Sequence, residues 1–151
     1  MKIEEIKSLI KGGESYNLEF KESYSDSVAK DICAFANANG GKIFLGVSDN
    51  KKIIGLQVTN KLKSQLHDLV RNFDPRFEIS LEEIGNILVI DISEGTNKPY
   101  STNGKFYIRH GTNSQQLSRE EIREFFQKEG LVLFDEKLNY DFNINKDFNE
   151  V

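Results

Sequence analysis

The chain has 151 residues, a length that predicts about one domain. Its hydrophobic content of 38%, with 11 phenylalanines, allows a real core and excludes a chain that is disordered throughout. The formal net charge of -4 argues against a globally basic nucleic-acid binder, although a local basic patch on an acidic protein can still bind phosphate.

Two short elements are expected at the N-terminus. Apolar residues recur at helical spacing over residues 3–10, and the following pair Gly12–Gly13 is expected to end that helix. Residues 17–21 then alternate strictly between polar and apolar, as in a strand with one buried and one exposed face. The polar face of this strand carries Asn17, Glu19 and Lys21.

A longer helix and a buried strand are expected next. The helix starts near Ser25 or Asp26, both good N-caps, and stops at Asn39-Gly40-Gly41. Cys33, the single cysteine, lies in its apolar pattern, so we expect a small core residue rather than a reactive thiol. Residues 43–47 form a nearly continuous apolar run, typical of a strand buried on both faces, and residues 53–58 are expected to return as its hairpin partner.

The second half predicts one helix and several strands before a last helix. The helix is expected over residues 61–73, followed by strands at residues 77–81, 87–92 and 106–109. Ser118 and Glu121 form a capping box for a helix that ends near residue 127. Helices interleave with strands, but hairpins dominate the second half. This order predicts an α+β fold, a two-layer mixed sheet with packed helices, rather than a doubly wound parallel sheet.

The sequence predicts one domain over residues 1–130. Residues 131–151 are rich in Asn, Asp and Lys, and are interpreted as a polar tail or the start of a downstream region. The N-terminus mixes acids and lysines without a long apolar run, and no segment is apolar enough to span a bilayer. A single cysteine suits a reducing compartment, so we expect a cytoplasmic protein without membrane contact.

Three acids and a lysine near the N-terminus are candidate site residues: Glu14, Glu19, Asp49 and Lys21. Clustered carboxylates with a lysine can hold a hard divalent cation at a phosphodiester. They can equally be ordinary surface charge. Residues five apart on a regular strand face opposite sides, so Glu14 and Glu19 converge only if Glu14 lies in a bend at Gly12–Gly13.

Residues 97–119 contain no acid and carry four positive charges. Cations and aromatics interleave there, a mixture that suits phosphate contacts and base stacking, and the candidates are Lys98, Lys105, Tyr107, Arg109 and His110. Strand alternation places Lys105, Tyr107 and Arg109 on one face. The alternative is a hairpin whose aromatics belong to the core and whose cations are solvated. The two histidines, His67 and His110, have no second histidine at ligand spacing, which argues against a zinc site.

In chain order the sequence contains the strings EFK, AFANANGG, IFLGVSDN, IIGL, KPY, FYIRHGTNS and SREEI. Together they resemble the AlbA_2 domain, also called the Schlafen-type AlbA domain, over about residues 12 to 127. The resemblance implies an α+β fold like the Schlafen core. Prokaryotic members resemble DNA-binding or transcriptional regulator proteins, usually longer, with a further module downstream. An ATPase label also occurs in the family, but Gly40-Gly41-Lys42-Ile43 lacks the spacing of a phosphate-binding loop.

Schlafen-family ribonucleases carry two glutamates five residues apart before a lysine, and an aspartate after the GV strand. Those positions correspond here to Glu14, Glu19, Lys21 and Asp49. The resemblance implies that the three carboxylates would bind Mg²⁺ or Mn²⁺, with Lys21 stabilising the charge of the transition state. Those ribonucleases clamp RNA between two such lobes, so a single copy would have to dimerise.

The residues and the resemblance support three hypotheses. The leading one is a nucleic-acid-binding domain of a transcriptional regulator, which binds DNA or RNA through the basic hairpin region. The second is a metal-dependent endoribonuclease. The third is an assembly module that forms a homodimer through its sheet.

Overall fold

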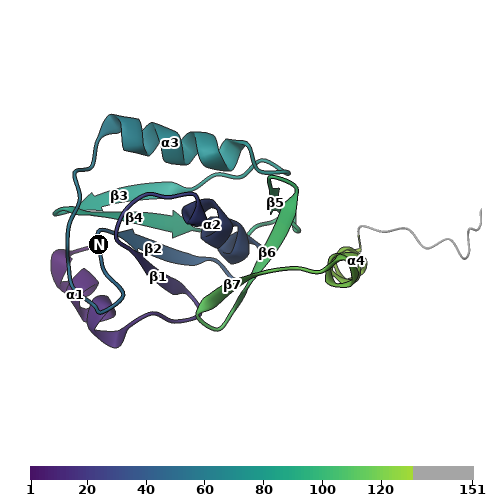
Figure 1. The fold of residues 1–151 in the computed structure, drawn as a ribbon, viewed down its shortest axis with the longest axis horizontal. Coiled ribbons are helices and arrows are strands. Elements are labelled where there is room, and N and C mark those ends of the chain that lie inside the picture. Colours follow the sequence, from purple (N-terminus) through teal and green to yellow (C-terminus); the bar gives the residue numbers. More distant parts are fainter. Residues whose placement is uncertain (131–151) are drawn as a thin grey trace, which may run out of the picture. The chain divides into compact units, whose positions relative to one another are not determined.

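The computed structural model describes residues 1–130. They form, in chain order, α1 (Ile3–Gly12), β1 (Leu18–Lys21), α2 (Ser27–Asn37), β2 (Gly41–Leu45), α3 (Asn60–Arg71), β3 (Ser80–Ile84), β4 (Ile87–Ile92), β5 (Ser101–Thr102), β6 (Lys105–His110), β7 (Asn113–Gln116) and α4 (Arg119–Lys128), as Figure 1 shows. The chain divides into two compact units, Met1–Ser118 and a unit that begins at Arg119 and contains α4. The first unit thus ends twelve residues before the expected boundary at residue 130. The expected tail, residues 131–151, lies outside the described residues.

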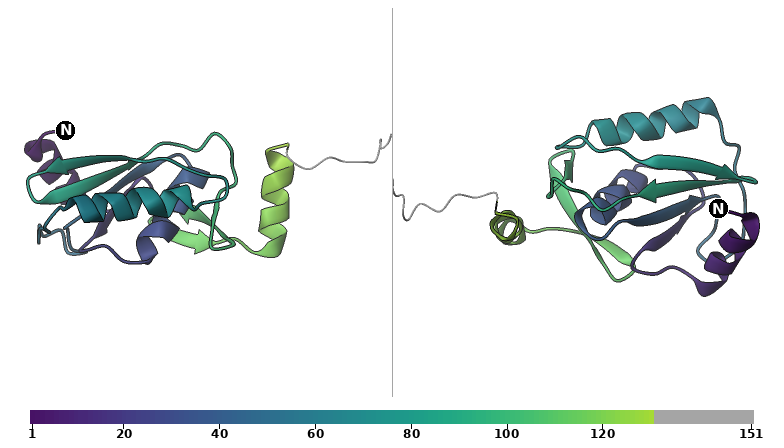
Figure 2. Two further views of the ribbon diagram at one scale, coloured as in Figure 1. Left: turned by 90° about the horizontal axis from the view of Figure 1, so that it is seen from above. Right: turned by 180° about the vertical axis from the view of Figure 1, so that it is seen from behind.

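The first unit holds two sheets. The larger sheet has the strand order β1-β2-β4-β3; β1 and β2 are parallel, and the other two pairs are antiparallel. The smaller sheet is the antiparallel set β5-β6-β7. α2 connects β1 to β2 and contacts strands of both sheets, so it lies between them (Figures 1 and 2). The expected α+β fold class is confirmed.

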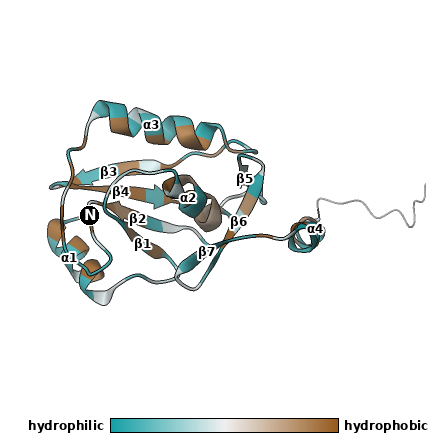
Figure 3. Cartoon of the chain, in the orientation of Figure 1, coloured by the Kyte–Doolittle hydropathy of each residue, from teal (hydrophilic) through white to brown (hydrophobic). Residues whose placement is uncertain are grey.

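Helices cover both faces of the larger sheet. α2 and α3 pack on one face, where the apolar side chains of β2 and β4 are Ile43, Leu45, Leu88, Ile90 and Ile92. α1 packs on the other face against the alternate strand positions, through Ile6 and Ile10. This explains why β2 reads as a continuous apolar run: successive side chains enter two different cores. Figure 3 shows the hydrophobic colour along β1, β2 and β4.

Cys33 and Gly40 fix the packing of α2. Cys33 is fully buried, with its Sγ 3.2 Å from the carbonyl oxygen of Tyr100, and burial raises its pKa to about 11. The expectation of a core residue is confirmed. Gly40 lies just after the helix at φ +80°, where a Cβ would lie 2.6 Å from the carbonyl oxygen of Ile92. Only glycine fits this approach of the helix end to β4.

Two sequence-based predictions of strands were wrong, and one strand was not predicted. Residues 53–58 form no strand: Ile53 makes one isolated bridge with Val47, and Gly55 turns away at φ +81°. The strand expected from residue 77 begins at Ser80, because the backbone N–H of Phe77 donates to the carbonyl oxygen of Val70 in α3, at 3.1 Å, and does not pair with a neighbouring strand. β7 was not predicted from the sequence, and its backbone pairs with β6. Among residues 1–130, no helix combines the length and the apolar character needed to cross a bilayer.

Candidate functional site

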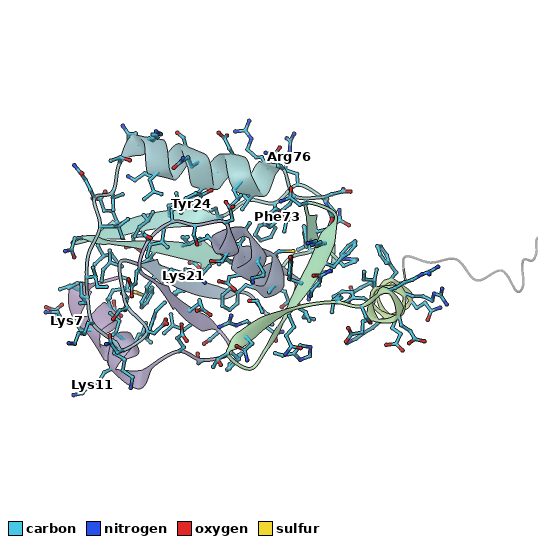
Figure 4. The ribbon with its side chains drawn as sticks, viewed as in Figure 1. Lys7, Lys11, Lys21, Tyr24, Phe73 and Arg76 are labelled. Carbon is cyan, nitrogen blue, oxygen red and sulfur yellow. The ribbon has the colours of Figure 1, made fainter. Side chains whose placement is uncertain are left out.

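A polar cleft of about 490 Å³ lies beside β1, and all four residues of the predicted carboxylate cluster line it: Glu14, Glu19, Lys21 and Asp49. We refer to it as the carboxylate cleft. Further walls come from α2, through Lys30 and Asp31, and from residues 112–114 at the start of β7. Figure 4 labels Lys21 in the middle of the unit, between β1 and α2. The fold therefore assembles side chains from distant parts of the sequence.

The bend that the sequence analysis required for Glu14 is present. Gly13 has φ +86°, a conformation that favours glycine, and the chain folds back so that Ser15 bridges to Leu18. One oxygen of the Glu14 carboxylate, Oε2, accepts a hydrogen bond from the backbone N–H of Phe20 at 3.0 Å. Glu14 thus returns to the edge of β1, and its carboxyl group forms a hydrogen bond with that of Glu19.

Glu19 has an unusual ionisation. Burial raises its pKa to about 8, and the hydrogen bond with Glu14 and the negative charges of Asp31 and Glu14 act in the same direction. The guanidinium of Arg109 opposes this rise. Glu19 therefore binds a proton more readily than an ordinary surface carboxylate does. Strongly perturbed carboxyl groups of this kind concentrate in functional clefts.

Arg109 lies beneath the carboxylate cleft and not on an exposed face. Its side chain is 1% exposed, and Nη2 lies 2.8 Å from Oε1 of Glu19. The guanidinium stacks on the ring of Phe35 at 4.6 Å and donates hydrogen bonds to Oγ of Ser114 at 3.1 Å and to the carbonyl oxygen of Ser15 at 3.2 Å. The expected role of Arg109 as a phosphate contact stays a prediction, and in this structure its guanidinium is engaged by groups within the fold.

Asp31 is a site residue that the sequence analysis missed. It is 4% exposed and lies between two cations: its Oδ2 is 3.0 Å from Nζ of Lys21, and its Oδ1 is 3.9 Å from Nη1 of Arg109. Neither Oδ2 of Asp31 nor Nε of Arg109 has a partner in hydrogen-bond geometry within residues 1–130, so Lys21 pairs with Asp31 through charge alone. The available signal was a carboxylate within the apolar pattern of a helix, a position that requires a charged partner.

The donor atoms of the carboxylate cleft suit a hard divalent cation, because they are carboxylate oxygens. Their arrangement in this structure is not a coordination shell: within residues 1–130, no group of three His, Cys, Asp or Glu side chains is placed to hold a metal ion. Glu19 is turned to Arg109, and Asp49 reaches the cleft from the turn after β2. A metal site formed by Glu14, Glu19 and Asp49 therefore stays a prediction.

The basic hairpin residues do not share one surface. Lys105 and Tyr107 line a second cavity, of about 330 Å³, together with Lys30, Thr102 and Asn103; we call it the Lys105 pocket. Lys98 is instead engaged by Glu94, 2.6 Å away, and this ion pair lowers the pKa of Glu94. His110 is exposed and lines neither cavity. Lys30, which the sequence analysis did not single out, lines both.

Comparisons with known proteins place this arrangement in a family. The sequence model described as "Schlafen, AlbA_2" matches residues 14–118. An uncharacterized ATP-binding protein of Ureaplasma parvum serovar 3 is 33% identical over 53% of this chain and 24% of its own length. The crystal structure of the DIP2311 protein from Corynebacterium diphtheriae has a similar fold, with a TM-score of 0.55 and 18% identity over 74% of this chain and 24% of that chain.

The chain therefore spans about a quarter of the length of these two proteins. The structural likeness, at 18% identity, concerns the fold alone. The family match is broader, because it contains both sheets, α2, α3 and all the residues that line the carboxylate cleft. This chain belongs to the Schlafen AlbA_2 family.

Proposed function

We propose that this protein binds nucleic acid, DNA or RNA, through the surface that joins the Lys105 pocket to the carboxylate cleft. The observation that carries the proposal is the position of Lys30, which lines both cavities. A nucleic-acid strand whose phosphates contact Lys30 and Lys105 would also lie along the carboxylate cleft. Tyr107, half-buried at the same pocket, offers a ring on which a base can stack.

The charge distribution supports this surface. Lys105 is exposed, and no ion pair involves it or Lys30 among the described residues, so both ammonium groups are available to phosphate oxygens. Phosphate contacts give affinity and register without reading sequence. Since the chain covers a quarter of its matched relatives, we propose that it serves as the nucleic-acid-binding part of a transcriptional regulator.

The Ureaplasma relative is named as an ATP-binding protein, but the glycine pair Gly40–Gly41 of this chain lacks the setting of a phosphate-binding loop. Lys42 follows the glycine pair Gly40–Gly41, but it is the second residue of β2, and its ammonium lies 3.1 Å from Oδ2 of Asp91. A phosphate-binding loop needs its lysine at the start of a helix, where backbone N–H groups surround the phosphates.

The test is the affinity for labelled single-stranded DNA, duplex DNA and RNA of equal length, measured by fluorescence anisotropy over a range of salt concentrations. The variants are Lys30→Gln and Lys105→Gln, with Lys61→Gln on α3 as the control of equal charge. We expect each of the first two to weaken binding and to reduce the salt dependence by about one counterion. Absence of binding at low salt, or equal losses for all three variants, would refute the proposal.

A metal-dependent endoribonuclease is the second candidate. It is favoured by the convergence of Glu14, Glu19, Lys21 and Asp49 on one cleft. The carboxylates would hold Mg²⁺ or Mn²⁺, which would activate water and polarise the phosphodiester. Lys21, 23% exposed and held by Asp31 and Ser27, would balance negative charge on the phosphate.

Cleavage of a structured RNA in Mn²⁺ tests the second candidate. We expect Glu19→Gln to lower the rate by roughly 100-fold. Glu22→Gln is the matched control, because Glu22 lines the same cleft but is exposed. Light scattering on the same sample reports whether the active species is a dimer. Cleavage that is absent, or equally slow in both variants, would exclude this activity for the cleft.

A further inference from the structure

A third cavity, of about 340 Å³, lies at the C-terminal end of α3 and shares no lining residue with the carboxylate cleft or the Lys105 pocket. We call it the α3 pocket. Its polar wall is formed by His67 and Arg71, one helical turn apart, and by Arg76 and Glu78 from the following loop. Figure 4 labels Arg76 at this end of α3, close to Phe73.

The loop that carries Arg76 is firmly attached to the core on both sides. Asp74 and Ser101 exchange two backbone hydrogen bonds, of 2.9 and 2.8 Å. The ring of Phe77 packs edge-on against Tyr100 at 5.1 Å and stacks with Phe73 at 6.4 Å. With one fixed point before Arg76 and one after it, the backbone of this residue is held opposite the last turn of α3.

The α3 pocket carries positive charge that the fold does not neutralise. Within residues 1–130, neither Arg71 nor Arg76 forms an ion pair, and Glu78 is the single acid that lines the pocket. Arg71 in the last turn is accounted for by the helix dipole, which favours a cation there. Arg76 lies beyond the helix and has no such structural reason to face the same cavity.

Two guanidinium groups at one cavity suit phosphate oxygens, because each planar group can donate two parallel hydrogen bonds. We infer that the α3 pocket is a second anion site, which binds the phosphate oxygens of a phosphorylated ligand. The ligand is either a free di- or polyphosphate or a backbone phosphate of nucleic acid. This site is separate from the surface proposed above and does not depend on it.

Amide chemical shifts of the full chain, followed by NMR while pyrophosphate is added at constant ionic strength, test this site. We expect saturable shifts at the end of α3 and in residues 74–79. Arg76→Gln and Arg71→Gln should each weaken pyrophosphate binding by roughly tenfold, the loss expected for a charge-assisted hydrogen bond. Lys61→Gln, at the other end of α3, removes the same charge and should leave the affinity unchanged.

Chemical-shift changes that do not saturate, or that lie in other parts of the chain, would overturn the inference. So would a loss of pyrophosphate affinity in Lys61→Gln equal to that in the arginine variants. A short oligonucleotide then separates the two ligand sources. Shifts of the same amides, lost in Arg76→Gln, identify a backbone phosphate; shifts with pyrophosphate alone identify a free phosphate. Lys105→Gln should not alter the pyrophosphate shifts, so failure of the surface at Lys30 and Lys105 and failure of the α3 pocket are distinguishable.

Discussion

The contact between Arg109 and Glu19 stabilises the carboxylate cleft. The guanidinium is almost fully buried, yet it meets two carboxylates, an aromatic face, a hydroxyl and a backbone carbonyl. A buried charge is tolerated only when its partners replace water in this way. Arg109 thereby joins β6 to β1 and α2, and it holds residues 112–114 over the cleft.

Replacement of Arg109 by Met should destabilise the protein by about 3 to 5 kcal/mol, since Asp31 would lose a buried counter-charge and Glu19 a hydrogen-bond donor. Urea denaturation at neutral pH measures the change in the free energy of unfolding. Lys105→Met is the control: it lies on the same strand but is exposed, and should change stability by no more than about 0.5 kcal/mol. Equal effects of the two substitutions would contradict the structural role of Arg109.

The raised pKa of Glu19 predicts a pH dependence of stability. Because the pKa is about 8 in the folded chain and ordinarily 4.5, folding favours the protonated carboxyl. This contribution is complete below pH 4.5 and is lost as the pH rises toward 8. Glu19→Gln, which mimics the protonated form, should therefore match the wild type at acidic pH and exceed its stability at about pH 9, above the raised pKa.

We expect the gain at about pH 9 to be about 1 to 2 kcal/mol, less than the full shift implies, because solvent at the open cleft screens the charge. Denaturation curves of both proteins at several pH values measure it. Glu22→Gln, at an exposed position of the same cleft, should show no such divergence. A Glu19→Gln curve parallel to the wild type at every pH would show that Glu19 ionises normally.

At the scale of elements, α2 is the connection between the two sheets. Its last residue, Asn37, is 2% exposed. The side-chain amide of Asn37 binds the backbone of Tyr100, just before β5, and of Tyr107 in β6. The amide nitrogen donates to the carbonyl oxygens of Tyr100 at 2.9 Å and Tyr107 at 2.8 Å, and the amide oxygen accepts from the N–H of Tyr100 at 2.6 Å. One side chain thus fixes β6, and with it Lys105 and Tyr107, relative to the carboxylate cleft.

Asn37→Ala should cost about 2 to 4 kcal/mol of stability, because three backbone groups each lose one hydrogen bond. Thermal or urea unfolding measures the loss. The amide signals of Tyr100 and Tyr107 should shift in NMR spectra. Asn72→Ala, at the exposed C-cap of α3, is the matched control and should be nearly neutral. A neutral Asn37→Ala would mean that the smaller sheet is held by other contacts.

At the scale of the molecule, the compact unit and the family match end at the same residue, Ser118. The core clusters of both sheet faces lie entirely within that unit. A domain with its own core can fold without the residues C-terminal to it.

A chain of residues 1–118 should therefore unfold cooperatively, with a free energy of unfolding within about 1 kcal/mol of the full chain. Circular dichroism on heating measures this. The amide spectrum of residues 1–110 should overlay on that of the full chain. A truncated chain without a cooperative transition would show that the part beginning at Arg119 is required for folding.

The sequence by itself determined most of the elements and the membership of the family. The spacing of apolar residues and the helix caps depend on neighbours within a few residues. Local pattern therefore predicts six of the elements: α1, α2, α3, β1, β2 and β4. The same holds for the bend at Gly13 that carries Glu14, since a glycine pair between a helix and a strand predicts a turn. β7 escaped prediction because backbone pairing, not side-chain pattern, makes it a strand.

The tertiary structure decided which charged side chains are free and which are paired. Alternation placed Lys105, Tyr107 and Arg109 on one face of β6, but it cannot indicate that α2 packs against β6 and that Arg109 is buried against Glu19. In the same way, only tertiary packing brings Asp31 into its buried ion pair with Lys21 and raises the pKa of Glu19. Burial and ion pairing depend on residues distant in the sequence, which come together only when the two sheets close on α2.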